Sequence, residues 1–282
     1  MRSDRGFFLL AALLLTLAFG AGCSTSHSPD RPVVAVSVDP QAYFVEQIAG
    51  DLVQVVVMVP PGANPATYSP TVHQIQALSD ASLYFKVGHP GFAFERAWLD
   101  SMLEVKSGLE IVDGAQDTPC TAGDPHLWVS PRAVRIMATS LAAGLGRILP
   151  DQRETLQTNL AVFLQRIDDL DHEIRASLGE HTGRGFLVYH PSWGCFAEEY
   201  GLEQIAIERD GKEPSTHDLA DLIESSKKDG IRVVFVQPQH SERAAEMVAE
   251  AIGGRVIAAD PLARDWPANL RSVAAALRES FE

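Results

Sequence analysis

The sequence has few basic residues and few cysteines, and it lacks an apolar run long enough to cross a bilayer. Its 282 residues include 23 Lys and Arg against 37 Asp and Glu, which gives a formal net charge of −14. Nucleic-acid binding relies on clustered Lys and Arg that neutralise phosphates, so this balance argues against nucleic-acid partners. The apolar run from Phe7 to Ala18 is shorter than the roughly 20 residues that a membrane-spanning helix needs. There is also no internal repeat and no low-complexity tract.

The first 22 residues have the character of an export signal. Arg2 and Arg5 precede the apolar run, and the small residues Gly20-Ala21-Gly22 lead to Cys23. This order resembles a bacterial lipoprotein signal, in which Cys23 would become the lipidated first residue and residues 23–32 a polar tether. The alternative is an ordinary secretory leader that releases a soluble protein. We expect a protein exported to the periplasm or to the outer face of the cytoplasmic membrane, anchored there by lipid.

The two remaining cysteines are Cys120 and Cys195. An exported protein meets an oxidising compartment, where two cysteines can form one disulfide. Free thiolates would instead favour binding of zinc or copper(I). Of these alternatives, a disulfide or a pair of inert buried thiols is favoured over ligation.

Strands and helices alternate along most of the chain. This order predicts an α/β protein of two lobes, each with a mainly parallel sheet flanked by helices. Between the lobes, apolar residues recur every three or four positions without an intervening glycine. They are Leu156, Leu160, Phe163, Leu164, Ile167, Leu170 and Ile174. A helix of this length would extend about 40 Å at 1.5 Å per residue and would join the lobes rigidly. The predicted boundaries are 33–149 for the first lobe, 150–180 for the connecting helix and 181–282 for the second lobe.

Three potential metal ligands lie at or near the carboxyl ends of predicted strands, where open α/β sheets bind their ligands. They are His126, His190 and Asp260. His126 lies in Asp124-Pro125-His126-Leu127-Trp128, where Asp124 could accept a hydrogen bond from one ring nitrogen and leave the other free. Buried carboxylates commonly orient metal-binding imidazoles in this way.

Several motifs together resemble the zinc and manganese solute-binding lipoproteins of bacterial ABC importers, the ZnuA/TroA-like family. They are Gly62-Ala63-Asn64-Pro65-Ala66-Thr67-Tyr68, Asp124-Pro125-His126-Leu127-Trp128, Tyr189-His190-Pro191-Ser192, Tyr200-Gly201-Leu202, Lys212-Glu213-Pro214-Ser215, Phe235-Val236-Gln237-Pro238-Gln239 and Asp260-Pro261-Leu262. The resemblance implies that His126, His190 and Asp260 are the second, third and fourth metal ligands. The family's first ligand is a histidine, and here Ala66 occupies its place.

Several residues could replace that missing ligand. We rank His89 first and Glu208 second, and His73 and His240 are further alternatives. The resemblance also bears on the metal, since manganese binders tend to carry a carboxylate where His190 stands. Two imidazoles and a carboxylate favour Zn²⁺ over Mn²⁺. The loop at residues 113–123 contains no histidine, unlike the His-rich loop that many zinc importers carry before Asp-Pro-His.

These observations predict a monomeric receptor that captures Zn²⁺ between two lobes and delivers it to the permease and ATPase of an ABC importer. A zinc hydrolase is an alternative because two imidazoles and one carboxylate also occur in metallohydrolases. It would need a general base such as Glu208 or Glu213, and the chain has no His-Glu-x-x-His helix. A third alternative is a cell adhesin or a binder of an organic ligand, suggested by Ala66 and by Trp128, Trp193 and Trp266. We expect the receptor, and no enzyme.

Overall fold

The structure is a computed structural model that describes residues 31–104, 106, 108–120, 123–208, 211–240 and 242–282. The predicted leader and Cys23 lie outside the described residues, as does most of the tether. Within the described residues, two four-stranded sheets form, and every pairing in them is parallel. In spatial order the first sheet contains β2 (Gln54–Val57), β1 (Val33–Val36), β3 (Ala81–Lys86) and β4 (Glu110–Asp113). The second contains β6 (Glu203–Ala206), β5 (Gly185–Val188), β7 (Val233–Val236) and β8 (Arg255–Ala258).

Helices connect and flank these strands. Those of the first half are α1 (Asp39–Ala49), α2 (Val72–Asp80), α3 (Ala93–Leu103) and α4 (Pro131–Ile148). Those of the second half are α6 (Gly194–Tyr200), α7 (Thr216–Lys228), α8 (Glu242–Ile252) and α9 (Trp266–Phe281). Short 3₁₀ turns occur at η1 (Gly50–Leu52), η2 (Leu127–Val129), η3 (Pro150–Gln152) and η4 (Gly179–His181). The α/β class and the two parallel sheets predicted from the alternation are confirmed.

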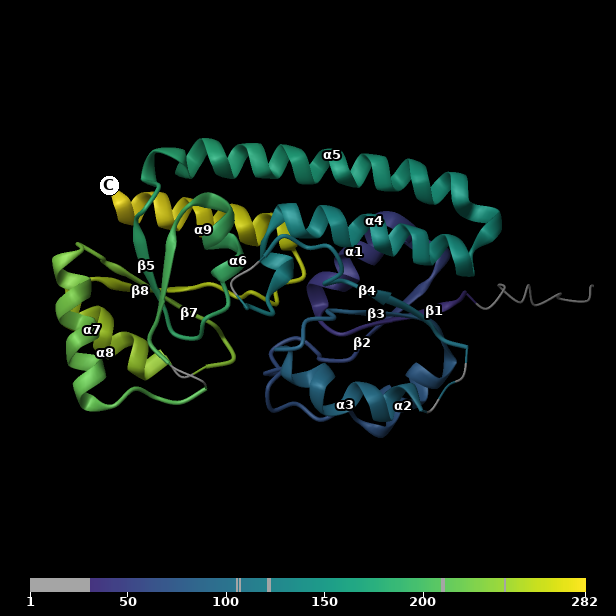
Figure 1. The fold of residues 1–282 in the computed structure, drawn as a ribbon, viewed down its shortest axis with the longest axis horizontal. Coiled ribbons are helices and arrows are strands. Elements are labelled where there is room, and N and C mark those ends of the chain that lie inside the picture. Colours follow the sequence, from purple (N-terminus) through teal and green to yellow (C-terminus); the bar gives the residue numbers. More distant parts are fainter. Residues whose placement is uncertain (1–30, 105, 107, 121–122, 209–210, 241) are drawn as a thin grey trace, which may run out of the picture. The chain divides into compact units, whose positions relative to one another are not determined.

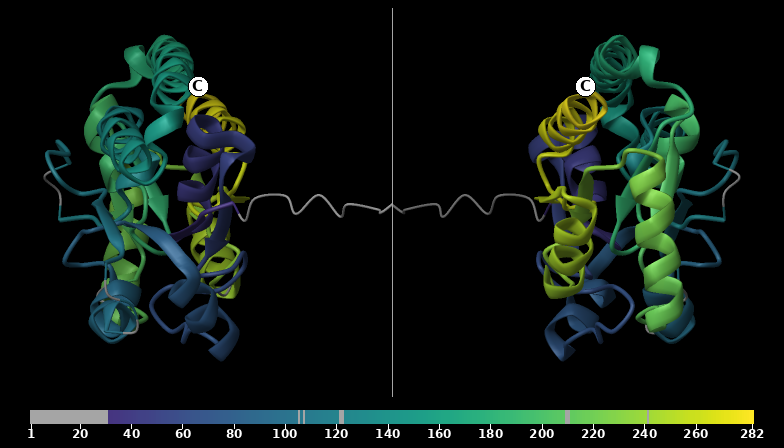
Figure 2. Two further views of the ribbon diagram at one scale, coloured as in Figure 1. Left: turned by 90° about the vertical axis from the view of Figure 1, so that its right-hand side faces the viewer. Right: turned by 90° about the vertical axis from the view of Figure 1, so that its left-hand side faces the viewer.

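The predicted connecting helix is α5 (Arg153–Leu178), 26 residues long. The proline at 150 opens a 3₁₀ turn, so the α-helix itself starts at Arg153. Its apolar face buries Leu156, Phe163 and Leu170. This face packs on α4 and α1 from the first half and on α9 from the second (Figure 1). The end-on views show α5 lying over α4 on one side and over α9 on the other (Figure 2).

The apolar core does not stop at the predicted boundary between the lobes. One cluster of buried side chains includes Val34 and Phe85 from the first sheet, Phe186 from the second and Leu270 from α9. A smaller cluster around Leu187 lies between the second sheet and α7 and α8. Residues 31–282 therefore form one compact unit. The lobe boundaries stay a sequence-based prediction.

In the described part of the chain, no helix combines the length and the hydrophobicity that a membrane crossing requires.

Candidate metal centre

The order of the strands determines which loops meet. β5 lies between β6 and β7 in the second sheet, and β8 lies outside β7. Because all four strands are parallel, the loops that follow them emerge at one edge. His190 follows β5, with Glu208 from the loop after β6 on one side and His240 from the loop after β7 on the other. Asp260, after β8, is one strand further away.

His126 is held by a buried carboxylate. Asp124 Oδ1 lies 2.6 Å from His126 Nδ1 and accepts a hydrogen bond of 2.9 Å from the His126 backbone N–H. Its second oxygen, Oδ2, accepts from the Gly194 N–H at 2.7 Å. A Cβ at position 194 would lie 2.6 Å from that oxygen, so this approach requires glycine. This confirms the predicted pairing of Asp124 with a ring nitrogen of His126.

The charge state of Asp124 follows from these contacts. Burial alone would raise its pKa, but the adjacent His126 ring, the hydrogen bonds from His126 and the Gly194 N–H together lower the pKa below its ordinary value. The carboxylate is therefore ionised at neutral pH and accepts the proton on His126 Nδ1. The Nε2 atom of His126 is left with a free lone pair, as a metal ligand needs.

His190 is held in the same manner. Its Nδ1 lies 2.5 Å from Glu208 Oε1, and the side chain of Glu208 is only 6% exposed. Gln237 adds a second support, because its Nε2 donates to the His190 carbonyl at 2.7 Å and its Oε1 accepts from the His190 N–H at 3.3 Å. Glu208, which sequence reasoning offered as a ligand, thus contacts the imidazole on the side that would face away from a metal.

The two imidazoles come together from distant parts of the chain. The ring centroids of His126 and His190 are 5.4 Å apart, with the planes at 81°. A third imidazole, His240, stacks on His190 at a centroid distance of 4.9 Å and an interplanar angle of 15°. Burial, and next the neighbouring His190 ring, lower the pKa of His240 although Glu208 acts to raise it. His240 is therefore neutral at pH 7 and able to bind a metal.

Asp260 lies beside this group but does not pair with it. Its Oδ1 accepts hydrogen bonds from the Leu262 N–H at 2.9 Å and from Gln239 Nε2 at 3.1 Å. Its neighbours Pro261 and Leu262 line a small cavity together with the three imidazoles. Within the described residues, no group of three or more His, Cys, Asp or Glu side chains is arranged to hold a metal ion.

The other residues considered as replacements for the missing ligand lie elsewhere. His89, our first choice for the fourth ligand, accepts a hydrogen bond at Nδ1 from the Gly91 N–H, 3.0 Å away, within its own turn. His73 is exposed near the start of α2. Ala66 lines the cavity that contains His126 and His190. Position 66 thus borders the candidate centre, and it carries only a methyl group there.

Cys120 and Cys195 form a disulfide with a Cα–Cα distance of 5.4 Å. Cys120 precedes His126 by six residues, and Cys195 follows His190 by five, on α6. The bridge therefore connects the two histidine-bearing segments and removes both thiols from the possible metal ligands.

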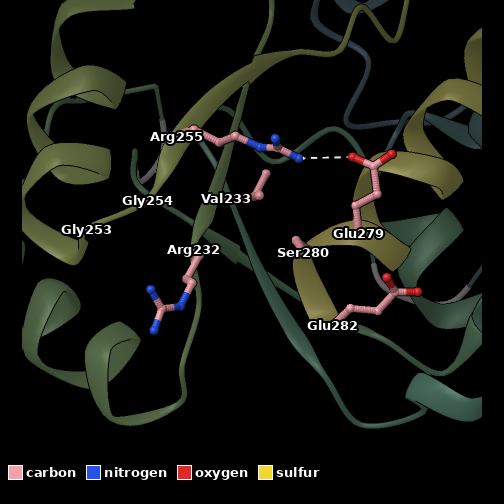
Figure 3. Close-up of a pocket in the computed structure, with 8 residues that line it drawn as sticks. All are labelled: Arg232, Val233, Gly253, Gly254, Arg255, Glu279, Ser280 and Glu282. Carbon is pink, nitrogen blue, oxygen red and sulfur yellow. Dashed lines mark hydrogen bonds and ion pairs between the residues drawn. The ribbon is translucent and has the colours of Figure 1, made fainter.

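A larger cavity, of about 410 Å³, lies at the amino ends of β7 and β8, against the end of α9 (Figure 3). Arg255 pairs there with Glu279 at 3.1 Å, and Arg232 points away from that pair. The residues that line this cavity are Arg232, Val233, Gly253, Gly254, Arg255, Glu279, Ser280 and Glu282. They include no imidazole and no thiol, so the smaller cavities at the carboxyl ends are the better candidate for a transition-metal centre.

Comparison with known proteins places this geometry in a family. The family described as "Zinc-uptake complex component A periplasmic" matches residues 34–280. A solved crystal structure of ZnuA is 38% identical, covers 90% of this chain and 100% of that one, and superposes with a TM-score of 0.85. The high-affinity zinc uptake system protein ZnuA of Bacillus subtilis is 26% identical over 277 residues, 89% of this chain and 86% of that protein. The laminin-binding protein of Streptococcus agalactiae, described as adhesin and metal transporter, shares the fold at 22% identity, with a TM-score of 0.79 over 89% of this chain and 100% of that one.

Proposed function

Because this chain belongs to the family of periplasmic zinc-uptake component A proteins, we propose that it is the solute-binding component of a zinc ABC importer and that His126 and His190 bind the ion. The zinc-uptake function matches what the related ZnuA proteins are described as doing. Members of this family are transport components, so the hydrolase alternative is not favoured. The adhesin neighbour, at 22% identity, supports the fold alone.

One observation carries the assignment of the site. Two imidazoles lie 5.4 Å apart, and a buried carboxylate holds the Nδ1 of each. With each Nδ1 directed at a carboxylate, both Nε2 atoms remain to bind a metal in one cavity. Imidazole nitrogen suits zinc better than it suits manganese. His240 and Asp260 are the candidates for a third ligand. The stacking of His240 on His190 favours His240, while the family resemblance favours Asp260.

Equilibrium dialysis of the purified mature chain with elemental analysis tests this function. We expect one tightly bound zinc, lost in His126→Ala and in His190→Ala. The third ligand is identified by comparing His240→Ala with Asp260→Ala, since the ligand variant should lose far more affinity than the other. His73→Ala, which changes an exposed histidine outside the cavity, is the matched control and should bind zinc like the parent. A chain that binds no zinc, or binds it unchanged without His126, would contradict the proposal.

The membrane association is part of the same proposal. The sequence up to Cys23 supports lipidation, and the importer's permease and ATPase would be the partners of the anchored receptor, which we propose acts as a monomer. Mass spectrometry of the protein purified from membranes should find a diacylglyceryl group on Cys23, and Cys23→Ser should release the protein from membranes. An unmodified protein that is free in the periplasm would show that the leader is an ordinary secretory signal.

A further inference from the structure

The candidate centre opens on one side into a second cavity. Its volume is about 330 Å³, and His126 and His190 lie in its wall. A bare metal ion and its water would need far less room, whereas cavities of about 300 Å³ are at the lower end of those that hold small organic ligands. The cavity therefore has space for a molecule of amino-acid size beside the metal.

Ala66 is what leaves this space open. It lines the cavity together with the two imidazoles, and it is exposed in the structure. A histidine or glutamate at this position would extend into the cavity and supply a donor atom, but a methyl group cannot. The imidazoles come from other segments, namely the loops after β5 and β7 and the Asp124–His126 segment. The loop that carries Ala66 supplies no side-chain donor at position 66, and a zinc site with fewer than four protein ligands leaves a position for an external ligand.

The other residues that line this cavity indicate which kind of ligand could complete the coordination of the metal. Much of the wall is apolar, formed by Pro65, Ala66, Phe92, Ala93, Pro125 and Pro191. Among the described residues that line it, the one carboxylate, Glu208, is directed at His190 Nδ1. The polar exception on the side of Ala66 is Asn64, whose Oδ1 accepts from the Ala66 N–H at 2.9 Å. Within the described residues, Nδ2 of Asn64 donates no hydrogen bond. Its two N–H groups are therefore available to a carboxylate in the cavity.

We propose that this protein takes up zinc as a complex with one free amino acid, of which histidine is the best fit. The nitrogen donor of the amino acid would occupy the position that Ala66 leaves open, and its carboxylate would accept from Asn64. This inference rests on the proposed zinc site and adds that the transported species is a zinc chelate. It also explains how a binding protein can lack one ligand of its family and still complete the coordination of the metal.

Cobalt substitution tests this proposal. Co²⁺ replaces zinc in imidazole sites, and its visible absorption responds to exchange of a single ligand. We expect added imidazole, and separately L-histidine, to change the spectrum of the cobalt-loaded mature chain in a saturable way. Cobalt should stay with the protein after gel filtration, and radiolabelled histidine should elute with it at one per chain. Coupling between two ligands is reciprocal, so imidazole should in turn strengthen the binding of zinc. We expect the apparent dissociation constant for zinc to fall by about tenfold, a usual size for such coupling.

Three substitutions at position 66 and one at position 64 sharpen the test. Ala66→His restores an internal donor, so this variant should bind zinc tightly without imidazole and its cobalt spectrum should not respond to added ligands. Ala66→Leu places an apolar side chain without a donor at this position, so it should keep the metal but weaken the response. Ala66→Ser, the conservative control, should respond like the parent. Asn64→Ala should weaken the response to histidine but not to imidazole.

Two results would overturn the proposal while leaving the zinc-binding function intact. One is a cobalt-loaded parent whose spectrum ignores both probes, which would mean that water or a protein group fills the position. The other is cobalt that histidine strips from the protein without forming a ternary species. A parent that binds no metal in any of these conditions would contradict the zinc-binding function itself, which separates the two failures.

Discussion

At the scale of single residues, two buried carboxylates decide which nitrogen each imidazole offers. Asp124 holds Nδ1 of His126, and Glu208 holds Nδ1 of His190. Both carboxylates are largely shielded from water, with side chains 7% and 6% exposed. The hydrogen bonds fix the tautomer and the orientation of each ring before a metal arrives, so binding does not have to order them.

Glu208 is therefore expected to act on the metal through His190. In Glu208→Gln the side chain keeps its shape and can still accept from Nδ1–H, but its charge is lost. We expect zinc affinity to fall by about 10- to 100-fold, the usual cost of removing such an outer partner. Competition with a fluorescent chelator measures the zinc affinity of the variant and of the parent. Glu213→Gln, at an exposed carboxylate nearby, should leave the affinity unchanged. A loss in Glu208→Gln equal to that in His190→Ala would show that Glu208 binds the metal directly.

The residues of the site were predictable to different degrees. His126 and His190 follow from their places after strands and from the motifs around them, and Asp124 follows from its spacing to His126. His240 was considered but ranked below His89. Its approach to His190 depends on β7 pairing with β5, a sheet order that the sequence does not reveal. His89 also follows a strand, but its ring accepts from its own turn, a local contact that no periodicity indicates.

At the scale of elements, the short helix α6 connects the two halves of the site. Cys195 on α6 is bridged to Cys120, and Gly194 donates to Asp124. Glu199, one turn further along, accepts from the hydroxyl of Ser130 at 2.5 Å and so contacts the residue that caps α4. One helix of the second half therefore holds both the His126 loop and the start of α4.

Loss of the disulfide should weaken both the fold and the site. The bridge closes a loop of 75 residues, and loop-closure entropy then predicts a stabilisation of roughly 4 kcal/mol. In the double variant Cys120→Ser/Cys195→Ser we expect a lower free energy of unfolding in urea titration and weaker zinc binding, because the His126 and His190 segments are no longer joined. Unchanged zinc affinity in a folded double variant would show that the bridge has no part in positioning the imidazoles.

Glu199 should make stability depend on pH. Burial, with the charge of Asp171, raises its pKa to about 7 despite the hydrogen bonds from Ser130 and Arg132 and the charge of Arg175. In the unfolded chain the carboxyl titrates near its ordinary value of 4.5. Between those two values the folded protein holds the proton and the unfolded chain releases it. Stability therefore falls as pH rises through this window, by at most roughly 3 kcal/mol for such a shift.

Glu199→Gln removes the titrating group, so its melting temperature should change less between pH 5 and pH 8 than that of the parent. Differential scanning calorimetry at the two pH values measures this. Glu154→Gln, at an exposed carboxylate near the start of α5, serves as the control and should keep the parent's slope. An unaltered slope in Glu199→Gln would contradict the assigned pKa.

Most elements could be placed from the sequence because their signals are local. The alternation of strands and helices predicts two parallel sheets, and the spacing of apolar residues predicts the long helix that the structure forms as α5. The sequence predicts a helix start at Pro150, whereas this proline opens η3 and α5 begins at Arg153. The order of strands within each sheet depends on long-range packing, and no motif in the sequence encodes it.

At the scale of the whole molecule, the residues beyond Asp260 tie the two halves together. Trp128 Nε1 donates to the Pro261 carbonyl at 2.6 Å, and Trp266 Nε1 donates to the Trp128 carbonyl at 2.6 Å. Arg264 pairs with Asp39 of α1 at 2.5 Å and with Glu46 of the same helix. Together with α5 and the shared core, these contacts oppose wide bending between the halves.

Zinc binding should accordingly change the molecule little. Backbones of preorganised sites move by about 1 Å or less on binding. We therefore expect small-angle X-ray scattering to give closely similar radii of gyration for the metal-free and zinc-loaded protein. Release would then proceed by small tilts and local loop motion. Arg264→Ala should weaken the contacts between the two halves of the metal-free protein. The difference in radius of gyration between the metal-free and zinc-loaded forms should then be larger than in the parent. A large compaction of the parent on zinc binding would mean that its halves do close by a hinge.

A crystal structure of the mature chain grown with zinc and measured at the zinc absorption edge tests the proposed zinc site most directly. We expect one anomalous peak within bonding distance of Nε2 of both His126 and His190, with Asp124 and Glu208 still bound to the opposite ring nitrogens. A zinc peak elsewhere, or none at these two imidazoles in a zinc-saturated crystal, would contradict the proposed site.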